Sequence, residues 1–340
     1  MTYISSKIIK GRRYAYLTRP IRMPDGNVIK LSKLLSHDEK KNITTLVKKY
    51  GNYFDQKEIE LAAKWAVQKY KAGHIFSAEE IRKIEIIKVS YNRLIKNVIK
   101  EQRKDIFDRF TANFTYDSNA IEGNSLTLKD VAVVMFDKES IPGKPLREIY
   151  ETRNSCLVVD MLLKKRFKLE ERDIVRMHHM LMRDIDPRRG YKILPNIIYR
   201  TEKEVHTTPP ENVGKEMKGL IEWFNSSKLH PLERAAILHG KFEKIHPFED
   251  GNGRVGRFLI NAILVNSGYP PLIIRKTSRQ AYMSALSAFD TGHEDKLKRF
   301  ILERFKETYR KFFEVYASYA DIQREKMKEL WDNKNDDVWK

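Results

Sequence analysis

Two helical patterns that meet at a glycine-rich bend constrain the fold of this chain more than any other feature of its sequence. Apolar side chains recur at helical spacing on both sides of the bend: Leu232, Ala235, Ala236 and Phe242 before it, and Val255, Phe258, Leu259, Ala262 and Ile263 after it. Pro247 prevents the first helix from simply continuing. The spacing therefore predicts two buried helices joined by a short loop, with the second helix beginning at about Asn252.

The loop delivers groups that bind anions to the start of the second helix. Gly251 and Gly253 lie where free backbone N–H groups and the positive end of the helix dipole favour an anion. Arg254 and Arg257, three residues apart, project from the same side of the first turn and can fork onto phosphate oxygens. Two such arginines alone are more often a solvated helix face. Their combination with the glycines favours a phosphate site.

Two further residues of the same stretch add chemistry to this site. His246 precedes the bend, and because its ordinary pKa lies near neutrality it can take a proton from an attacking hydroxyl. Asp250 supplies a hard oxygen ligand suited to a Mg²⁺ ion shared with phosphates. Base, anion site, metal ligand and arginines within twelve residues indicate a phosphoryl-type transfer site.

Residues 246–257 resemble the signature of the Fic family, His-x-Phe-x-Asp/Glu-Gly-Asn-Gly-Arg-x-x-Arg, at every fixed position. The similarity extends over roughly residues 107–289 by the arrangement of helices. The resemblance implies an all-α, mainly helical Fic fold with a β-hairpin flap. It also implies a protein adenylyltransferase, which transfers AMP from ATP to a hydroxyl side chain of a target protein or of itself.

The resemblance assigns roles in catalysis and in loop structure to three residues. His246 would be the general base, Phe248 would anchor the loop in the core, and Asp250 would bind Mg²⁺. ATP would be the substrate, and pyrophosphate would leave. Adjacent histidines His178 and His179 lack spaced ligand partners, so core or surface roles are favoured for them over metal binding.

The resemblance also implies a set of nucleotide contacts. Asn252 would bond the α-phosphate, and the amides near Gly251 and Gly253 would form the anion hole. Arg254 would hold the α- and β-phosphates, and Arg257 would meet the γ-phosphate. Relatives resembling Doc toxins, which phosphorylate their target, carry Lys at the position of Gly253. This glycine therefore implies nucleotidyl transfer.

A second motif, residues 118–124, resembles the inhibitory helix of the family, Ser/Thr-x-x-x-Glu-Gly/Asn. Ser118 and Glu122 lie at i and i+4 on one helix face. The resemblance implies that Glu122 is aimed at Arg257 and displaces the γ-phosphate, so that the enzyme restrains itself. Two alternatives stay open: Glu122 is a surface glutamate before the helix-capping Gly123, or it aligns a water that removes AMP from a modified target.

The remaining patterns predict three regions. Residues 1–102 form an accessory region with helices and a small β-hairpin, whose strands are Tyr14–Leu17 and Val28–Leu31. Residues 103–290 form the Fic domain, with the inhibitory helix at 107–122 and the flap at 194–210. Residues 291–340 form a helical tail. Residues 197–208 of the flap would pair with an extended segment of the target.

Composition limits the partners and the compartment. Lys and Arg number 65 against 46 Asp and Glu, a surplus of 19, which favours phosphate-bearing or acidic partners. The charges are spread along the chain, so nucleic acid is not expected as a partner. A basic protein that senses nucleotide or binds nucleic acid is kept as the alternative function. A homodimer is compatible with these patterns.

Location is predicted from cysteine content and hydropathy. Cys156 is the only cysteine, so no intrachain disulfide can form, and a reducing compartment fits best. No stretch has the uninterrupted apolar character of a signal peptide or a membrane helix. The sequence therefore predicts a soluble protein of the cytoplasm.

Overall fold

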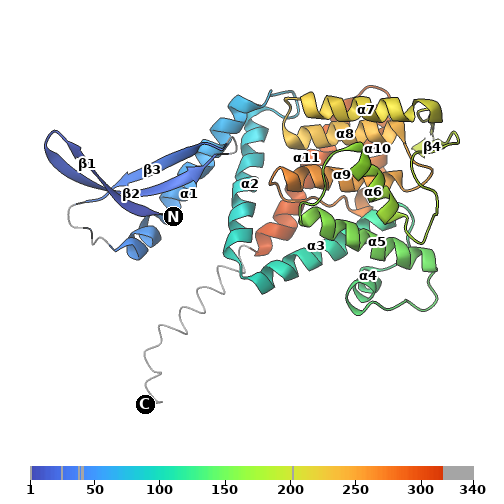
Figure 1. Ribbon diagram of the computed structural model, residues 1–340, viewed down its shortest axis with the longest axis horizontal. Coiled ribbons are helices and arrows are strands. Elements are labelled where there is room, and N and C mark those ends of the chain that lie inside the picture. The colour runs from blue at the N-terminus through green and yellow to red at the C-terminus, as the bar shows by residue number, and fades with distance from the viewer. Residues whose placement is uncertain (1, 24–25, 37–38, 40–41, 201–202, 317–340) are drawn as a thin grey trace, which may run out of the picture. The chain divides into compact units, whose positions relative to one another are not determined.

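The computed structural model describes residues 2–23, 26–36, 39, 42–200 and 203–316 (Figure 1). The chain divides into two compact units, Met1–Val89 and Ser90–Lys340. The division falls within helix α2 (Ala78–Asn97), whereas the expected boundary at residue 102 lies within α3 (Lys100–Ile121).

The first unit contains a three-stranded antiparallel sheet in the order β1–β2–β3. Its strands are β1 (Tyr3–Ile9), β2 (Arg12–Arg22) and β3 (Val28–Leu34). The predicted hairpin corresponds to β2 and β3, and β1 adds a strand that the sequence analysis did not predict. Two residues of the predicted turn, Pro24 and Asp25, lie outside the described residues.

One helix packs on this sheet and provides the core of the unit. Helix α1 (Ile43–Lys69) begins after Asn42, whose side-chain oxygen accepts from the amides of Thr44 and Thr45. Leu17 and Leu35 of the sheet region pack with Leu46 and Phe54 of α1 in one buried cluster. The sheet therefore has one face covered by α1.

The second unit is mainly helical, as predicted. Its helices and strands are α3 (Lys100–Ile121), α4 (Leu128–Ala132), η1 (Val133–Asp137), α5 (Leu146–Leu163), α6 (Glu171–Leu181), β4 (Ile197–Arg200), β5 (Lys203–His206), α7 (Pro210–Ser226), α8 (Pro231–Ile245), α9 (Asn252–Asn266), η2 (Lys276–Ser278), α10 (Arg279–Asp290), α11 (Glu294–Thr308) and η3 (Tyr309–Phe313). Strands β4 and β5 form the predicted flap hairpin, and its residues 201 and 202 lie outside the described part.

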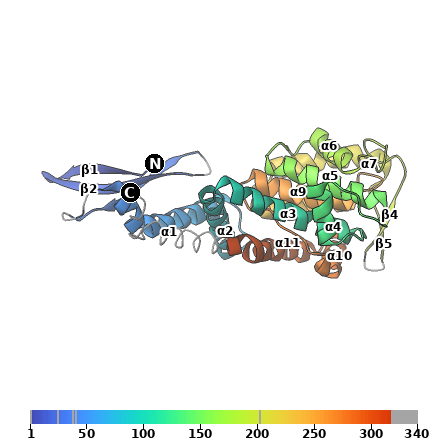
Figure 2. The same cartoon turned by 90° about the horizontal axis from the view of Figure 1, so that it is seen from below.

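Helix α9 lies in the middle of the second unit (Figure 2), where it packs against α8. Helix α9 contacts α3, α5, α6 and α8, so that most of its side chains are buried. Helix α11 packs on α8 and α10 and therefore belongs to this unit instead of forming a separate tail. The rest of the expected tail, residues 317–340, lies outside the described residues. Nowhere in the described chain is a helix both long and apolar enough to span a membrane.

Candidate active site

The loop between α8 and α9 has a fixed and unusual backbone. His246 ends α8 with φ 51° and ψ 61°, in the left-handed region that residues other than glycine adopt at a cost of roughly 1–2 kcal/mol. Gly251 precedes α9 with φ 81°, which glycine adopts without strain. These two turns direct the segment between them back across the start of α9.

Buried contacts support this loop from below. The side-chain oxygen of Asn252 accepts from the Phe248 amide at 2.9 Å, and its Nδ2 donates to the Phe248 carbonyl at 2.7 Å. The ring of Phe248, which is fully buried, stacks on His178 at 3.8 Å between centroids. Phe248 is thus placed as the predicted loop anchor. Asn252, for which the resemblance implies a bond to the α-phosphate, uses its side-chain oxygen and one N–H of its amide to brace the loop.

His246 is held as a neutral imidazole. Burial lowers the pKa of His246 to about 4, so the ring is uncharged at pH 7. Its Nδ1 lies 3.4 Å from the carbonyl oxygen of Glu243. With the proton on Nδ1 donating to this carbonyl, Nε2 has a free lone pair. This nitrogen can therefore accept a proton from a hydroxyl.

The C-terminal end of α3 meets the first turn of α9 through three polar contacts. Nη2 of Arg257 lies 2.7 Å from Oε1 of Glu122. Nε of the same guanidinium donates to Oγ of Ser118 at 3.0 Å, and Nη2 donates to the Ser118 carbonyl at 2.8 Å. Arg257 is 2 % exposed. Glu122 therefore lies against the arginine at which the sequence predicted it to be aimed.

Gly253 lets the Glu122 carboxylate lie directly against the helix start. A Cβ atom at residue 253 would lie 2.3 Å from Oε1 of Glu122 and 3.2 Å from Nη1 of Arg257. The first amides of a helix lack partners within the helix and attract an anion. The carboxylate of Glu122 thus stands where the sequence predicts an anion site.

Buried donors without partners lie in the same turn. Among the described residues, Nε and Nη1 of Arg254 and Nη1 of Arg257 make no hydrogen bond. Arg254 is 2 % exposed, and its nearest carboxylate oxygen, in Glu151, lies 3.4 Å away. A buried guanidinium with unmade hydrogen bonds is unfavourable. These donors therefore fit a ligand that supplies several oxygen acceptors.

Asp250, in the loop between α8 and α9, has a partly exposed carboxylate that lies close to two arginines. It pairs with Nη2 of Arg147 from α5, and its Oδ1 accepts from the Gly251 amide at 2.5 Å. Burial opposes ionisation, but the charges of Arg254 and Arg147 lower the pKa of Asp250 below its ordinary value. No cluster of three or more metal-ligating side chains occurs in the described part of the chain. One ionised carboxylate fits a Mg²⁺ ion that takes its remaining ligands from phosphate and water.

The flap is tied to the same loop by buried polar contacts. Nζ of Lys192 donates to Oδ1 of Asn196 at 2.7 Å and to Oγ1 of Thr207 at 2.6 Å. Asn196 in turn donates to the Phe248 carbonyl at 3.1 Å. From the last residue of β4, Arg200 donates to the Glu243 carbonyl at 3.0 Å and pairs with Asp290 at 2.6 Å. The flap and His246 therefore share the Glu243 carbonyl as a common support.

Several of these residues were not predicted from the sequence. Arg147 and Glu151 come from α5, Lys192 precedes the flap, and Arg200 ends its first strand. Each lies far from the loop in sequence and belongs to no short motif, so spacing gives no signal for it.

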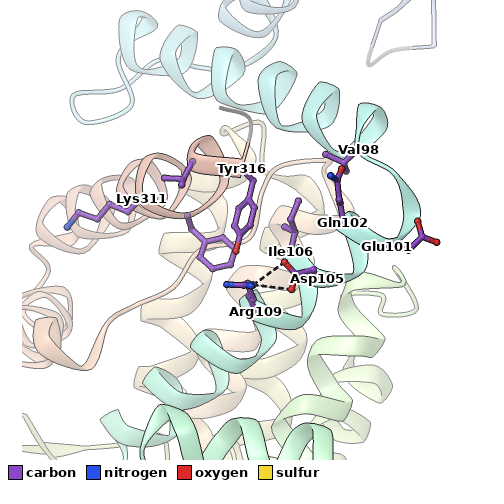
Figure 3. A pocket seen from close by; sticks show the side chains of 10 residues that line it. Val98, Glu101, Gln102, Asp105, Ile106, Arg109, Lys311 and Tyr316 are labelled. Carbon is purple, nitrogen blue, oxygen red and sulfur yellow. Dashed lines mark hydrogen bonds and ion pairs between the residues drawn. The ribbon is translucent and has the colours of Figure 1, made fainter. Parts of the chain in front are cut away.

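A separate cavity of about 720 Å³ lies at the opposite end of α3 (Figure 3). Its lining includes Ile106 and Arg109 of α3 and Phe312 of η3, and none of the predicted site residues. Arg109 is already bound to Asp105 through Nε at 3.0 Å. The arrangement suited to chemistry is therefore the loop between α8 and α9.

Comparison with known proteins agrees with the geometry of this loop. Residues 168–264 match the family model described as Fic/DOC family. Protein adenylyltransferase Fic from Nematostella vectensis is 32 % identical over 229 residues, which are 64 % of this chain and 52 % of the relative. Protein adenylyltransferase fic-1 from Caenorhabditis elegans is 29 % identical over 61 % of this chain and 42 % of the relative. The chain thus spans about half the length of these relatives.

The fold is shared with solved structures. A Fic domain containing signaling protein from Bacteroides thetaiotaomicron superimposes with a TM-score of 0.61 and 24 % identity, over 68 % of this chain and 96 % of that one. This likeness confirms the predicted mainly helical fold with small β elements.

Proposed function

Because residues 168–264 match the Fic/DOC family model, we propose that this protein is a nucleotidyltransferase that moves AMP from ATP to a hydroxyl side chain of a protein. The observation that carries the proposal is the pair of buried arginines on α9, Arg254 and Arg257, which have N–H groups without a hydrogen-bond partner among the described residues. A triphosphate supplies the oxygen acceptors that these donors lack.

The proposed reaction uses one proton transfer and one displacement. The hydroxyl oxygen attacks the α-phosphorus while its proton passes to Nε2 of His246, and the bond from that phosphorus to pyrophosphate breaks. The amides near Gly251 and Gly253 stabilise the charge that develops on the phosphoryl oxygens. A Mg²⁺ ion, which would be held by Asp250 and the phosphates, supplies further charge neutralisation.

Support for the resting state of this enzyme comes from Glu122. Its carboxylate lies 2.7 Å from Arg257, the residue that the family resemblance assigns to the γ-phosphate. A carboxylate and a phosphate repel one another, and both need the same guanidinium. We therefore propose that ATP binds productively only when Glu122 moves away, and that the protein restrains its own activity.

The acceptor is proposed to be a protein segment that lies along the flap. Strand β4 belongs to a two-stranded hairpin, so it retains an edge with which an extended segment can pair. Tyr199 is 72 % exposed and Ile193, just before the flap, is 80 % exposed. These side chains offer apolar contacts beside that edge. The target can be another protein of the cytoplasm or a second copy of this chain.

The test is transfer of label from α-labelled ATP to protein in the presence of Mg²⁺. Glu122→Gly should incorporate label, and Glu122→Gly combined with His246→Ala should lose about a hundredfold or more of that rate, since general-base catalysis contributes this much. The combination of Glu122→Gly with His293→Ala, which removes an exposed histidine at the α10–α11 turn, is the control. Full activity of the His246→Ala protein would exclude the proposed base.

Removal of AMP is the alternative reaction at the same site. Its specific support is that the Glu122 side chain is 38 % exposed, so one face of the carboxylate can meet a water. Incubation of a modified target with the wild-type protein and with Glu122→Gly separates the two. Release of AMP by the wild type alone would assign hydrolysis to Glu122.

A further inference from the structure

The N-terminal sheet concentrates positive charge that looks dispersed in the sequence. Strands β1, β2 and β3 carry seven Lys or Arg residues and no Asp or Glu. Side chains alternate between the two faces of a sheet, and the antiparallel register decides which residues of neighbouring strands share a face. The register therefore shows how these charges are divided.

The face that packs on α1 holds three of the seven cations, and two of them contact that helix. Nη1 of Arg19 lies 2.6 Å from Oδ1 of Asp55. Nζ of Lys33 lies over the ring of Tyr53, at 4.8 Å from its centroid. The third cation, Arg13, is exposed near the start of β2. Arg19 and Lys33 therefore act in packing within the unit.

The opposite face, here called the basic sheet face, comprises Lys7, Arg12, Tyr14, Tyr16, Arg22 and Lys30. Lys7 is paired with Tyr14, and Lys30 with Pro20, in the strand register. The even-numbered residues of β2 from Arg12 to Arg22 point the same way. All four cations are exposed, and none pairs with a carboxylate among the described residues. Four cations therefore face outward without an acidic neighbour.

Two tyrosines lie between these cations on the central strand. Tyr14 and Tyr16 are two positions apart, about 6.7 Å along a strand. Both rings are partly exposed, and Nζ of Lys7 lies 5.4 Å from the centroid of Tyr16. Aromatic rings in a row on a sheet, flanked by cations, stack successive bases while the cations bind the phosphates.

We propose that the basic sheet face binds single-stranded nucleic acid, with bases stacked on Tyr14 and Tyr16 and phosphates bound by Lys7, Arg12, Arg22 and Lys30. Charge complementarity identifies a polyanion as the ligand. The two neighbouring tyrosine rings favour single-stranded nucleic acid over a duplex, because only unpaired bases are free to stack on them. The inference lies within residues 3–34 and does not depend on the proposed transfer reaction.

The test is fluorescence anisotropy of the whole protein with labelled oligo-dT and oligo-rU of about 15 nucleotides. Binding should weaken with salt, and Lys7→Gln with Lys30→Gln should lower the slope against log salt by about 1.4, since each phosphate contact contributes about 0.7. Tyr16→Leu should weaken binding about tenfold, and Tyr16→Phe should not. The two oligonucleotides distinguish DNA from RNA.

A matched control removes equal charge elsewhere in the same unit. Lys64→Gln with Lys69→Gln alters two exposed lysines of α1 and should leave the slope unchanged. An equal loss in this control would assign binding to net charge and overturn the proposal. Three other results would also overturn the proposal: no binding of either oligonucleotide, tighter binding of a duplex of equal length, or binding of polyglutamate but not of the oligonucleotides. Circular dichroism checks that the variants are folded. If a tyrosine variant is not folded, the comparison of salt slopes between the two double lysine variants still tests the proposal.

Discussion

At the scale of single residues, the site contains two ion pairs in which oppositely charged side chains neutralise each other. Arg257 is paired with Glu122, and Asp250 is paired with Arg147. In each pair, one residue has a different partner in the proposed reaction: the γ-phosphate for Arg257 and Mg²⁺ for Asp250. Under the proposed function, binding of ATP with Mg²⁺ would exchange these protein partners for phosphate and metal, and the strength of the two ion pairs would set the free energy that the exchange requires.

Arg147→Gln tests this exchange at the proposed metal ligand. Without the guanidinium, Asp250 is free to bind Mg²⁺, so the Mg²⁺ concentration that gives half-maximal transfer should fall. Both side chains are partly exposed, at 56 % and 41 %, and an ion pair of this kind is worth at most about 1 kcal/mol, so the decrease should be about two- to fivefold.

The measurement is a Mg²⁺ titration of label transfer in a Glu122→Gly background. Arg153→Gln is the matched control, because this arginine also lies on α5 and pairs with a different carboxylate, Asp184. A higher Mg²⁺ requirement in Arg147→Gln would mean that Arg147 positions Asp250 for the metal, opposite to the competition described here.

At the scale of elements, several contacts fix the C-terminal end of α3 in place. Ser118 and Glu122 meet Arg257, and the Ile121 carbonyl accepts from Nε of Arg279 at 2.9 Å. Asp117 accepts from Nη1 of Arg275 at 2.9 Å. Because the docking is shared, no single hydroxyl holds the helix in place.

Ser118→Ala should therefore release restraint only in part. It removes the acceptor for Nε of Arg257 but keeps the Glu122 pair, and one hydrogen bond to a charged group contributes about 1.5–3 kcal/mol. Label transfer should rise above wild type yet stay below that of Glu122→Gly. Thr111→Ala is the control, since the Thr111 hydroxyl donates to Phe107 of its own helix at 2.7 Å. A decrease in Ser118→Ala would show that Ser118 supports ATP binding.

Local patterns predicted the elements that carry the site. The α8–loop–α9 unit and the helix-capping Gly123 are both present. These features depend on residues within one or two turns of each other, where periodicity and capping preferences act. Strand β1 was missed because its polar and apolar residues do not alternate, and only pairing with β2 makes it a strand.

Contacts between distant elements could not be predicted in the same way. Arg147 meets Asp250 across 103 positions, and Arg200 meets Asp290 across 90. Such pairs depend on how helices pack, which a single sequence does not specify. The continuous α1 is a related case: glycine disfavours a helix interior, yet α1 runs through Gly51, because burial of Leu46 and Phe54 against the sheet stabilises the helix on both sides of it.

At the scale of the whole molecule, the two units differ in how far their ionisable side chains are buried. The second unit buries several of them near α8, including His239, Glu243 and Arg200. The first unit leaves four cations exposed on its sheet. Titration should therefore affect the stability of the second unit, and for His239 the sign is clear, because a histidine that is buried neutral must take up a proton when the chain unfolds in acid.

His239 allows that effect to be measured. Burial, with the charges of Arg257 and Arg200, lowers its pKa to about 3, from an ordinary value of 6.5. Between these values the unfolded chain binds a proton that the folded protein does not, so the free energy of unfolding falls as pH falls below 6.5. His239→Gln removes this contribution and should make the decline from pH 7 to pH 5 shallower by up to about 1.4 kcal/mol per pH unit.

Urea unfolding at a series of pH values gives the two slopes. His239→Gln will also lower stability at every pH, because it disturbs a hydrogen bond to Tyr282 at 2.7 Å, so only the slopes are compared. His74→Gln, at an exposed histidine of the first unit, should leave the slope of the wild type unchanged. If His239→Gln and the wild type decline in parallel, His239 is already able to take up a proton in the folded protein, and the buried neutral state is wrong.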